Sequence, residues 1–305
     1  KSFSLECSVK ISPFKKKIKI DSDKSISIRS FLIGSISEDI SIVKNVLESE
    51  DVMNSVFSLR KLGVKIKKID SQAYKIYGKG IGSLFAKKNL KLNFGNSGTL
   101  ARLLVGILST TPGIEIKIQG DKSLNKRNMS KLIELMSKFG AKFLPENKFN
   151  FPLKLISSEM PVCIKYHAGV SAQLKRAVII AGLNSYGTTE IIEERRSRDH
   201  TENMLIQNQH AIKVKNGKSK LIEIFGKQYL KNINIDVPGD PSSAAFFVAL
   251  VILNKNCSLK IKNVGLNPTR IGFYELLKNH GANIKFINKR KKNNEIIGDI
   301  IVKSK

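Results

Sequence analysis

The chain has 305 residues, 41% of them hydrophobic, and its 53 Lys and Arg against 25 Asp and Glu give a formal net charge of +28 at pH 7. This length and apolar content suffice for two hydrophobic cores and exclude an intrinsically disordered chain. No run reaches the ~18 consecutive apolar residues of a membrane-spanning helix, and the first residues lack the apolar stretch of a signal peptide, so we expect a cytoplasmic protein.

The first predicted helix follows the polar turn Asp23-Lys24-Ser25 and is largely apolar. A second helix ends at Leu62-Gly63-Val64 and runs into an apolar strand. The next turn, Gly95-Asn96-Ser97-Gly98, leads into an apolar run at residues 103–108 with helical spacing. These segments predict that polar turns feed apolar helices in the first third of the chain.

The pattern then completes one whole unit. Residues 114–118 alternate with a period of two, as in a strand, and residues 129–139 return to helical spacing before Gly140. The predicted order of elements in a unit is therefore β-α-β-α-β-β. A third unit opens at Gly169-Val170-Ser171-Ala172, and a fourth opens at Pro238-Gly239-Asp240.

Four copies of this unit account for nearly the whole chain. Their helices start at Ser25, Ser97, Ser171 and Ser243, which lie 72, 74 and 72 residues apart. A helix pair on one side of a short mixed sheet cannot bury its apolar faces alone, so the copies must pack helix against helix around a shared core. The sequence predicts an α/β protein built from repeats.

Polar and basic residues gather at the predicted helix starts. Unpaired N–H groups and the positive end of the helix dipole favour an anion there. The first start adds Lys24 and Arg29, and the glycines of the second let backbone amides approach a ligand. For each segment alone, a capped surface helix with solvated charges is the alternative. The remaining candidate segments are Ser171-Ala172-Gln173, Asn125-Lys126-Arg127-Asn128 and Ser197-Arg198-Asp199-His200-Thr201-Glu202.

Five segments, in this order along the chain, resemble the 5-enolpyruvylshikimate-3-phosphate synthase family. They are Asp23-Lys24-Ser25-Ile26-Ser27-Ile28-Arg29, Gly95-Asn96-Ser97-Gly98-Thr99-Leu100-Ala101-Arg102, Ser171-Ala172-Gln173, Ser197-Arg198-Asp199-His200-Thr201-Glu202 and Pro238-Gly239-Asp240-Pro241-Ser242-Ser243-Ala244-Ala245. The resemblance implies transfer of the enolpyruvyl group of phosphoenolpyruvate to the 5-hydroxyl of shikimate 3-phosphate, with release of phosphate. The segments Gly95-Asn96-Ser97-Gly98-Thr99 and Ser197-Arg198-Asp199-His200-Thr201-Glu202 are similar to those of the family branch that often tolerates glyphosate.

The resemblance also implies roles for individual residues. Lys24 lies between both substrates and is the catalytic candidate. The residues implied for shikimate 3-phosphate are Lys24, Ser25, Arg29, Ser171, Ala172, Gln173 and Arg198. Those implied for phosphoenolpyruvate are Lys24, Asn96, Gly98, Arg127 and Gln173. A strongly positive cleft suits two polyanionic substrates that must be brought into contact. The resemblance implies no metal, no organic cofactor and a monomer.

The family fold consists of inverse α/β barrel domains with six β-α-β-α-β-β repeats, of which this chain supplies four. We expect residues 20–228 to form a complete three-repeat domain. Residues 1–19 and 229–305 would form one repeat of an incomplete second domain, with exposed apolar helix faces at residues 244–253. The C-terminal third of the family pattern is absent, so we expect a truncated chain that is not catalytically competent alone.

Three alternatives remain open. The related enolpyruvyl transferase that acts on UDP-N-acetylglucosamine usually carries a cysteine near the position of Arg127, and residues 119–130 contain none. The chain could instead be a noncatalytic binding remnant of the fold. Nucleic acid binding would suit the charge, but the lysines are spread along the chain, aromatic residues amount to 7% and tryptophan is absent.

The chain's cysteines, Cys7, Cys163 and Cys257, are odd in number and far apart. This spacing predicts neither a disulfide framework nor a metal cluster.

Overall fold

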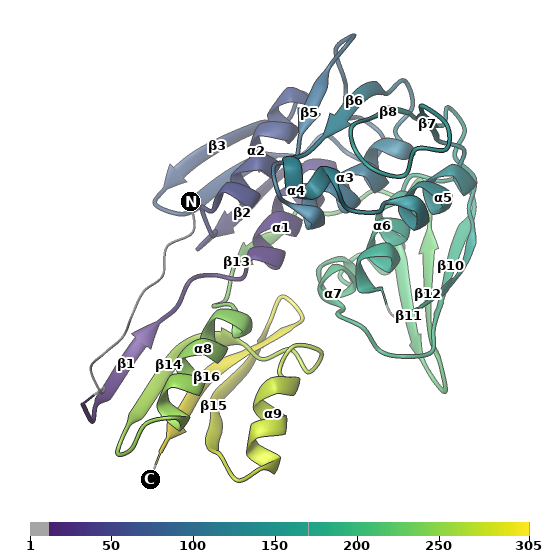
Figure 1. Ribbon diagram of the computed structural model, residues 1–305. Helices are drawn as coiled ribbons and strands as arrows, with labels where there is room; N and C mark the ends of the chain where they lie inside the picture. The colour runs from purple at the N-terminus through teal and green to yellow at the C-terminus, as the bar shows by residue number, and fades with distance from the viewer. Residues whose placement is uncertain (1–11, 170, 305) are drawn as a thin grey trace. The chain divides into compact units, whose positions relative to one another are not determined.

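The computed structural model describes residues 12–169 and 171–304 (Figure 1). Cys7 and Val170 lie outside the described residues. The chain divides into two compact units. Of the described residues, the larger unit contains those of 22–237 and 293–295, and the smaller contains 12–21, 238–292 and 296–304. Helices and four mixed sheets alternate in repeats, which confirms the predicted α/β class and the four repeats. Within the described residues, none of the sheets closes into a barrel.

The larger unit contains three repeats. The elements of the first are α1 (Lys24–Ile36), β2 (Ile40–Lys44), α2 (Glu50–Lys61), β3 (Lys65–Asp70) and β4 (Ala73–Tyr77). Those of the second are β5 (Lys91–Asn93), α3 (Gly98–Ser109), β6 (Glu115–Gln119), α4 (Lys122–Asn125), α5 (Ser130–Lys138), β7 (Lys142–Leu144) and β8 (Leu153–Ile156). The third contains β9 (Lys165–Ala168), α6 (Ala172–Gly182), β10 (Thr188–Glu193), α7 (His200–Leu205), β11 (Ile212–Asn216) and β12 (Lys220–Phe225).

Each of these repeats contributes one four-stranded sheet. The second and third repeats use their own strands, in the orders β5-β6-β8-β7 and β9-β10-β12-β11. The first sheet has the order β13-β2-β4-β3, and its edge strand β13 (Asn234–Asp236) comes after the third repeat and pairs parallel with β2. Ile233, Ile235 and Val237 join the larger core. The larger unit therefore extends through Val237, whereas the sequence analysis placed the end of the domain at residue 228.

The smaller unit contains one repeat with its own core. Its elements are β1 (Lys15–Lys19), α8 (Pro241–Ile252), β14 (Ser258–Gly265), α9 (Gly272–Asn279), β15 (Asn283–Lys292) and β16 (Glu295–Lys303). The sheet order is β1-β14-β16-β15, with β1 parallel to β14. Apolar side chains on α8 are open to solvent, with Phe246 80% and Leu253 83% exposed, which confirms the predicted exposed helix face.

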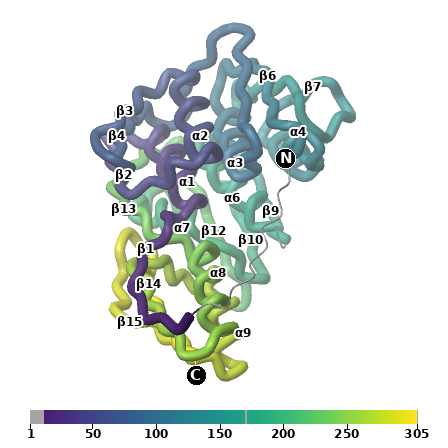
Figure 2. The backbone as a smooth tube through the Cα atoms, turned by 60° about the vertical axis from the view of Figure 1, so that its left-hand side comes forward, coloured from purple at the N-terminus to yellow at the C-terminus, as the bar shows by residue number. Residues whose placement is uncertain are grey.

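Three helices form the centre of the larger unit. In α1, α3 and α6 nearly every side chain is buried, the charged Arg29, Lys175 and Arg176 included, because these helices lie inside the unit rather than at its surface. Gly106 of α3 lets the backbone of α6 approach, since a Cβ at this position would lie 2.8 Å from the carbonyl oxygen of Ala177. The helix α3 packs against both α1 and α6, as the sequence repeats require (Figure 2).

Candidate active site

The central helices α1, α3 and α6 bring their C-terminal ends together. The amide of Asn184, just after α6, donates a hydrogen bond to the carbonyl of Thr110, just after α3. The loop that holds Gly80 and Gly82 joins α1 to the same place: the N–H of Gly80 donates to the carbonyl of Ser37 at 3.1 Å, and Gly82 lies against Asn184. Since the helices are packed side by side and meet at their C-terminal ends, their N-terminal ends lie together at the opposite end of the unit.

The gathered N-terminal ends form a positive region. Each helix start exposes backbone N–H groups and carries the positive end of a helix dipole. Asp23 accepts a hydrogen bond from the N–H of Ile26 at 2.9 Å, and Ser97 accepts one from Leu100 at 3.3 Å, so both side chains cap their helices. Among the described contacts, the Ser171 side chain makes no such capping bond at the start of α6. The start of α6, which lacks a side-chain cap, can therefore bind an anion through its N–H groups.

Two of the predicted cations project from α1. Lys24 is half exposed, and its Nζ lies 2.9 Å from Oδ2 of Asp51 on α2. Arg29 is fully buried. Its Nη1 donates to the carbonyl of Ser25 at 2.5 Å and its Nε donates to Oγ1 of Thr201 on α7 at 3.2 Å. The guanidinium group therefore ties the start of α1 to α7, while direct contact with a ligand remains a prediction.

Three of the residues predicted for phosphoenolpyruvate, Asn96, Gly98 and Arg127, lie together at the start of α3. Nη2 of Arg127 donates to Oδ1 of Asn96 at 2.5 Å, and Nη1 of Arg102 donates to the carbonyl of Gly98 at 2.9 Å. Burial lowers the pKa of Arg102, and the neighbouring charge of Arg127 lowers it further. Two guanidinium groups beside a helix N-terminus repel one another, so an anion placed between them would be stabilised.

Replacing Gly98 by alanine tests this arrangement. A Cβ here would lie 2.6 Å from Nη1 of Arg127 and 2.8 Å from Nη1 of Arg102, so both guanidinium groups must move. We expect phosphoenolpyruvate to bind about tenfold more weakly, which corresponds to the loss of one hydrogen bond of ~1.4 kcal/mol. Calorimetry with phosphoenolpyruvate in the presence of shikimate 3-phosphate measures this change.

Gly272→Ala is the matched control for this prediction. Gly272 is also the first residue of its helix, α9, and no other side chain lies within 4 Å of a Cβ there. Equal affinities of Gly98→Ala and Gly272→Ala for phosphoenolpyruvate would contradict the assignment of Arg102 and Arg127 to one anion site.

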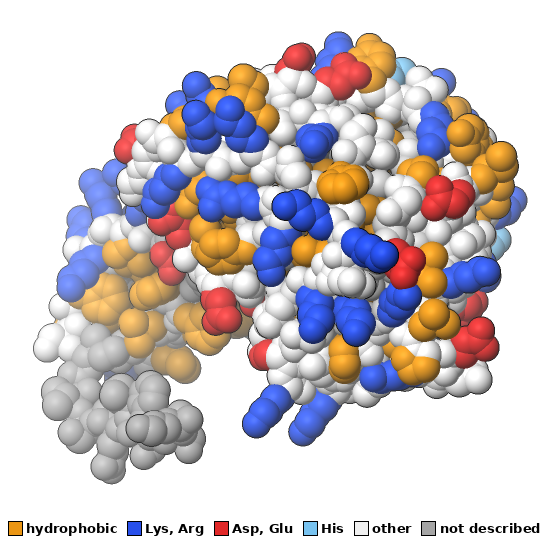
Figure 3. Space-filling model, turned by 90° about the horizontal axis from the view of Figure 1, so that it is seen from above, with side chains coloured by type: hydrophobic (Ala, Val, Ile, Leu, Met, Phe, Trp, Pro, Cys, Tyr) orange, Lys and Arg blue, Asp and Glu red, His pale blue; other side chains and the backbone are white. Residues whose placement is uncertain are grey.

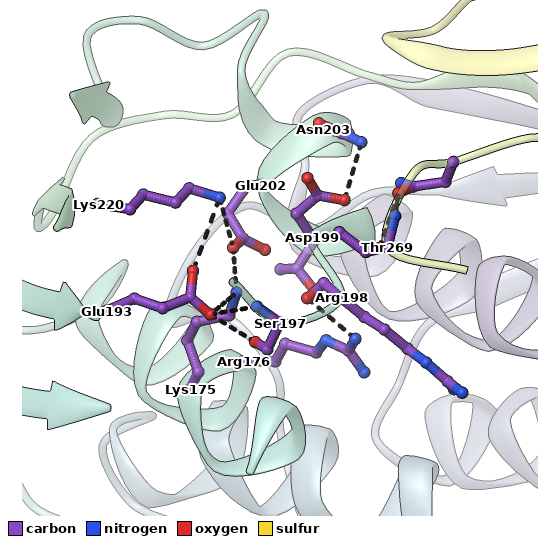
Figure 4. A network of polar contacts seen from close by, with 12 residues as sticks. Lys175, Arg176, Glu193, Ser197, Arg198, Asp199, Glu202, Asn203, Lys220 and Thr269 are labelled. Carbon is purple, nitrogen blue, oxygen red and sulfur yellow. Dashed lines mark hydrogen bonds and ion pairs between the residues drawn. The ribbon is translucent and has the colours of Figure 1, made fainter. Parts of the chain in front are cut away.

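The residues predicted for the phosphate of shikimate 3-phosphate lie at the start of α6 and in the loop before α7. Ser171, Ala172 and Gln173 are partly or fully exposed at the N-terminal end of α6. A cavity of about 490 Å³ opens beside Ser171 and is also lined by the basic residues Lys131, Lys138 and Lys165. Arg198 is exposed, and its carbonyl accepts a hydrogen bond from Nη2 of Arg176 on α6 at 3.1 Å (Figure 4).

The sequence analysis missed a buried group of charges behind this loop. Nζ of Lys175 lies 2.9 Å from Oε1 of Glu193 and 2.7 Å from Oε1 of Glu202, and all three side chains are almost completely inaccessible. Nζ of Lys220 lies 3.4 Å from Oε1 of Glu202. Figure 4 shows the four side chains pointing toward one another. One sequence signal could have revealed this group: Glu193 occupies an inward-facing position in the alternating strand Thr188–Glu193.

The pH dependence of stability can detect this group. Burial alone would raise the pKa of Glu193, but hydrogen bonds from Ser197 and Lys175 and the charge of Lys175 outweigh it, and the net pKa lies below the ordinary value of 4.5. The ionised carboxylate therefore stabilises the fold fully above pH 4.5 and ceases to do so as the pH falls through the folded-state pKa.

We expect Glu193→Gln to be less stable than the parent near neutral pH, and the gap in urea midpoint to shrink below pH 4.5. Urea titrations followed by circular dichroism at a series of pH values measure this gap. A gap that stays constant between about pH 7 and pH 3 would contradict the lowered pKa.

Features of a membrane span, a metal site and a nucleic acid surface were also sought in the described residues. Among the residues that the structure describes, no helix is both long enough and apolar enough to cross a membrane. The described ranges also contain no group of three or more His, Cys, Asp or Glu side chains arranged to hold a metal ion. On the face shown in Figure 3, Lys and Arg are scattered among hydrophobic and uncharged residues rather than joined in one stripe.

Comparisons with known proteins give a consistent result. The family model of EPSP synthase (3-phosphoshikimate 1-carboxyvinyltransferase) matches residues 9–302. Proteins named 3-phosphoshikimate 1-carboxyvinyltransferase from Zymomonas mobilis and Novosphingobium aromaticivorans are both 38% identical to the chain, over 96% and 95% of it. The chain spans 65% and 66% of their lengths. A solved structure of EPSP synthase from Acinetobacter baumannii is 35% identical to this chain, with a TM-score of 0.84. The match covers 95% of this chain and 65% of the chain in that structure.

Proposed function

Because the chain belongs to the EPSP synthase family, we propose that it binds shikimate 3-phosphate at the gathered N-terminal ends of α1, α3 and α6. The bound molecule would receive the enolpyruvyl group of phosphoenolpyruvate at its 5-hydroxyl, and phosphate would be released. The observation that carries this proposal is the convergence of three helix starts with basic side chains in one unit of the fold. The basic side chains are Lys24, Arg102, Arg127 and Arg198.

The proposed roles follow from the position of each group. Ser171, Ala172 and Gln173 offer the start of α6 to the phosphate of shikimate 3-phosphate, and Arg198 adds a planar guanidinium group that can bind phosphate with two hydrogen bonds. Ser25 and Arg29 would hold the shikimate carboxylate and ring. Asn96, Gly98, Arg127 and Gln173 would line the phosphoenolpyruvate side.

Lys24 is the proposed catalytic residue. Its ammonium group is half exposed at the start of α1, where its Asp51 partner holds it beside α2. A cation there would reduce the repulsion between two polyanions and stabilise the charge that develops on the departing phosphate. Holding both substrates in one site would also replace a bimolecular encounter by an oriented reaction.

Binding and turnover test different parts of this proposal. Calorimetry should show saturable binding of shikimate 3-phosphate to the chain. Release of phosphate from the two substrates, measured with protein free of host enzyme, tests the expectation that this chain alone is not competent. Absence of shikimate 3-phosphate binding by a folded chain would refute the proposed function. A monomeric state and a cytoplasmic location remain predictions.

A further inference from the structure

The loop that carries Arg198 is anchored on both sides of this residue. It connects β10 to α7 and spans residues 194–199. The preceding residue, Ser197, donates from its N–H at 2.9 Å and from its hydroxyl at 2.5 Å, both to Oε1 of Glu193. The carbonyl of Arg198 itself accepts from Nη2 of Arg176 at 3.1 Å. Two successive residues of an otherwise exposed loop are therefore held by side chains of the neighbouring elements.

The anchoring groups are themselves buried and fixed. Glu193 and Arg176 are 1% and 3% exposed. Glu193 cannot change rotamer without losing its 2.9 Å ion pair to Lys175, which is in turn held by Glu202 at 2.7 Å. A buried charge that loses its partner is costly, so the network has one favoured arrangement. Because Ser197 and Arg198 are bonded to this network, the network also restricts the conformation of the loop.

One helix supports both halves of the proposed phosphate site. Lys175 and Arg176 lie in α6, one turn after Ala172 and Gln173 at its start. The same helix thus presents its N-terminal end to the phosphate and fixes the backbone of Arg198 through Arg176. It also holds Glu193 in place through Lys175. In Figure 4 the side chain of Arg198 extends away from the carboxylates of Glu193 and Glu202. The carboxylate of Glu193 therefore holds the loop, and the guanidinium group of Arg198 points away from it.

We infer that Glu193, Lys175 and Arg176 are positioning residues that place Arg198 for recognition of the phosphate of shikimate 3-phosphate. This inference rests on the proposed function. These residues act through Arg198, because their own side chains are almost completely buried. A loop that is anchored before binding loses less conformational entropy when the ligand binds than a flexible loop would.

The test compares two variants that remove anchors with two that remove similar bonds elsewhere. Ser197→Ala deletes the hydroxyl that donates to Glu193, and Arg176→Met deletes the donor to the carbonyl of Arg198. The matched control for the first is Ser185→Ala, which removes a buried hydroxyl that donates to Gly182. The matched control for the second is Arg60→Met, which removes an arginine that donates to the carbonyl of Ile66.

Calorimetry with shikimate 3-phosphate and ligand-observed NMR with shikimate give the affinities. We expect the two anchor variants to bind shikimate 3-phosphate about tenfold more weakly, as is typical when the supports of a binding group are removed. Binding of shikimate, which lacks the phosphate, should change less than about twofold, and the two control variants should match the parent for both ligands. Arg176→Lys keeps a donor near the Arg198 carbonyl and should recover part of the affinity.

Hydrogen exchange measures the anchoring without any ligand. The peptide that covers residues 194–199 should exchange faster in Arg176→Met than in the parent and in Arg60→Met. If the parent binds shikimate 3-phosphate and the anchor variants bind it equally well, the inference is wrong while the proposed function stands. Equal losses for shikimate and its 3-phosphate would show a general structural effect and also overturn it. A folded parent that does not bind would overturn both.

Discussion

Replacement of Arg198 by alanine is expected to weaken the binding of shikimate 3-phosphate by about 10- to 100-fold. A hydrogen bond to a charged group contributes ~1.5–3 kcal/mol, and each ~1.4 kcal/mol corresponds to a factor of ten in the dissociation constant. Arg198 is exposed beyond its anchored backbone, so the substitution removes the guanidinium group with little loss of packing. Titration calorimetry with parent and variant measures the difference directly.

Arg195→Ala provides the control for this prediction. Arg195 belongs to the same loop, is also exposed, and its removal changes the net charge of the protein by the same amount. We expect a change in affinity of less than about threefold, because a screened surface charge acts only through the general field. If Arg195→Ala and Arg198→Ala weaken binding equally, the loop contributes charge rather than a specific phosphate contact.

Replacement of Lys175 by methionine is expected to destabilise the fold by about 3–5 kcal/mol. The substitution keeps much of the volume of the side chain but leaves two buried carboxylates, those of Glu193 and Glu202, without their shared ammonium group. Lys220 lies 4.0 Å from Glu193 and can compensate only in part. The midpoint of urea denaturation, followed by circular dichroism, should fall accordingly.

Lys165→Met separates the effect of burial from the loss of an ion pair. Lys165 pairs with Glu190 at 3.5 Å on the adjacent strands β9 and β10, but these side chains are 61% and 41% exposed. An exposed pair contributes at most about 1 kcal/mol, so this variant should remain close to the parent. A Lys175→Met variant as stable as Lys165→Met would mean that the buried network does not stabilise the fold.

Much of the fold was predictable because each repeat carries local signals. The polar turns before α1 and α3 cap these helices, and the apolar residues within them are buried, as helix capping and burial alone predict. The residues of β13, Asn234–Asp236, were instead expected in the second domain. A segment of three residues is too short to show a period, and its place is decided by pairing with β2. Tertiary pairing is invisible to a pattern read along the chain.

The sequence named candidate residues that lie together in the structure, but it did not reveal the buried charges behind them. Asn96, Gly98 and Arg127, named through the resemblance, lie together at the start of α3. Lys175 and Glu193 were missed because charged residues are usually taken as solvent-exposed, and only the structure shows that they face one another inside the larger unit. The structure buries every residue of α6 from Leu174 to Gly182, so no periodic pattern marked residue 175.

The proposed function depends on three helix starts and their basic side chains binding shikimate 3-phosphate. The most direct measurement is a calorimetric titration of the chain with shikimate 3-phosphate, beside a variant that carries Lys24→Ala and Arg198→Ala. We expect saturable binding by the parent and a loss of at least about 100-fold in the double variant, since two charge-assisted contacts are removed. No binding by a parent shown to be folded by circular dichroism, or equal binding by the double variant, would contradict it.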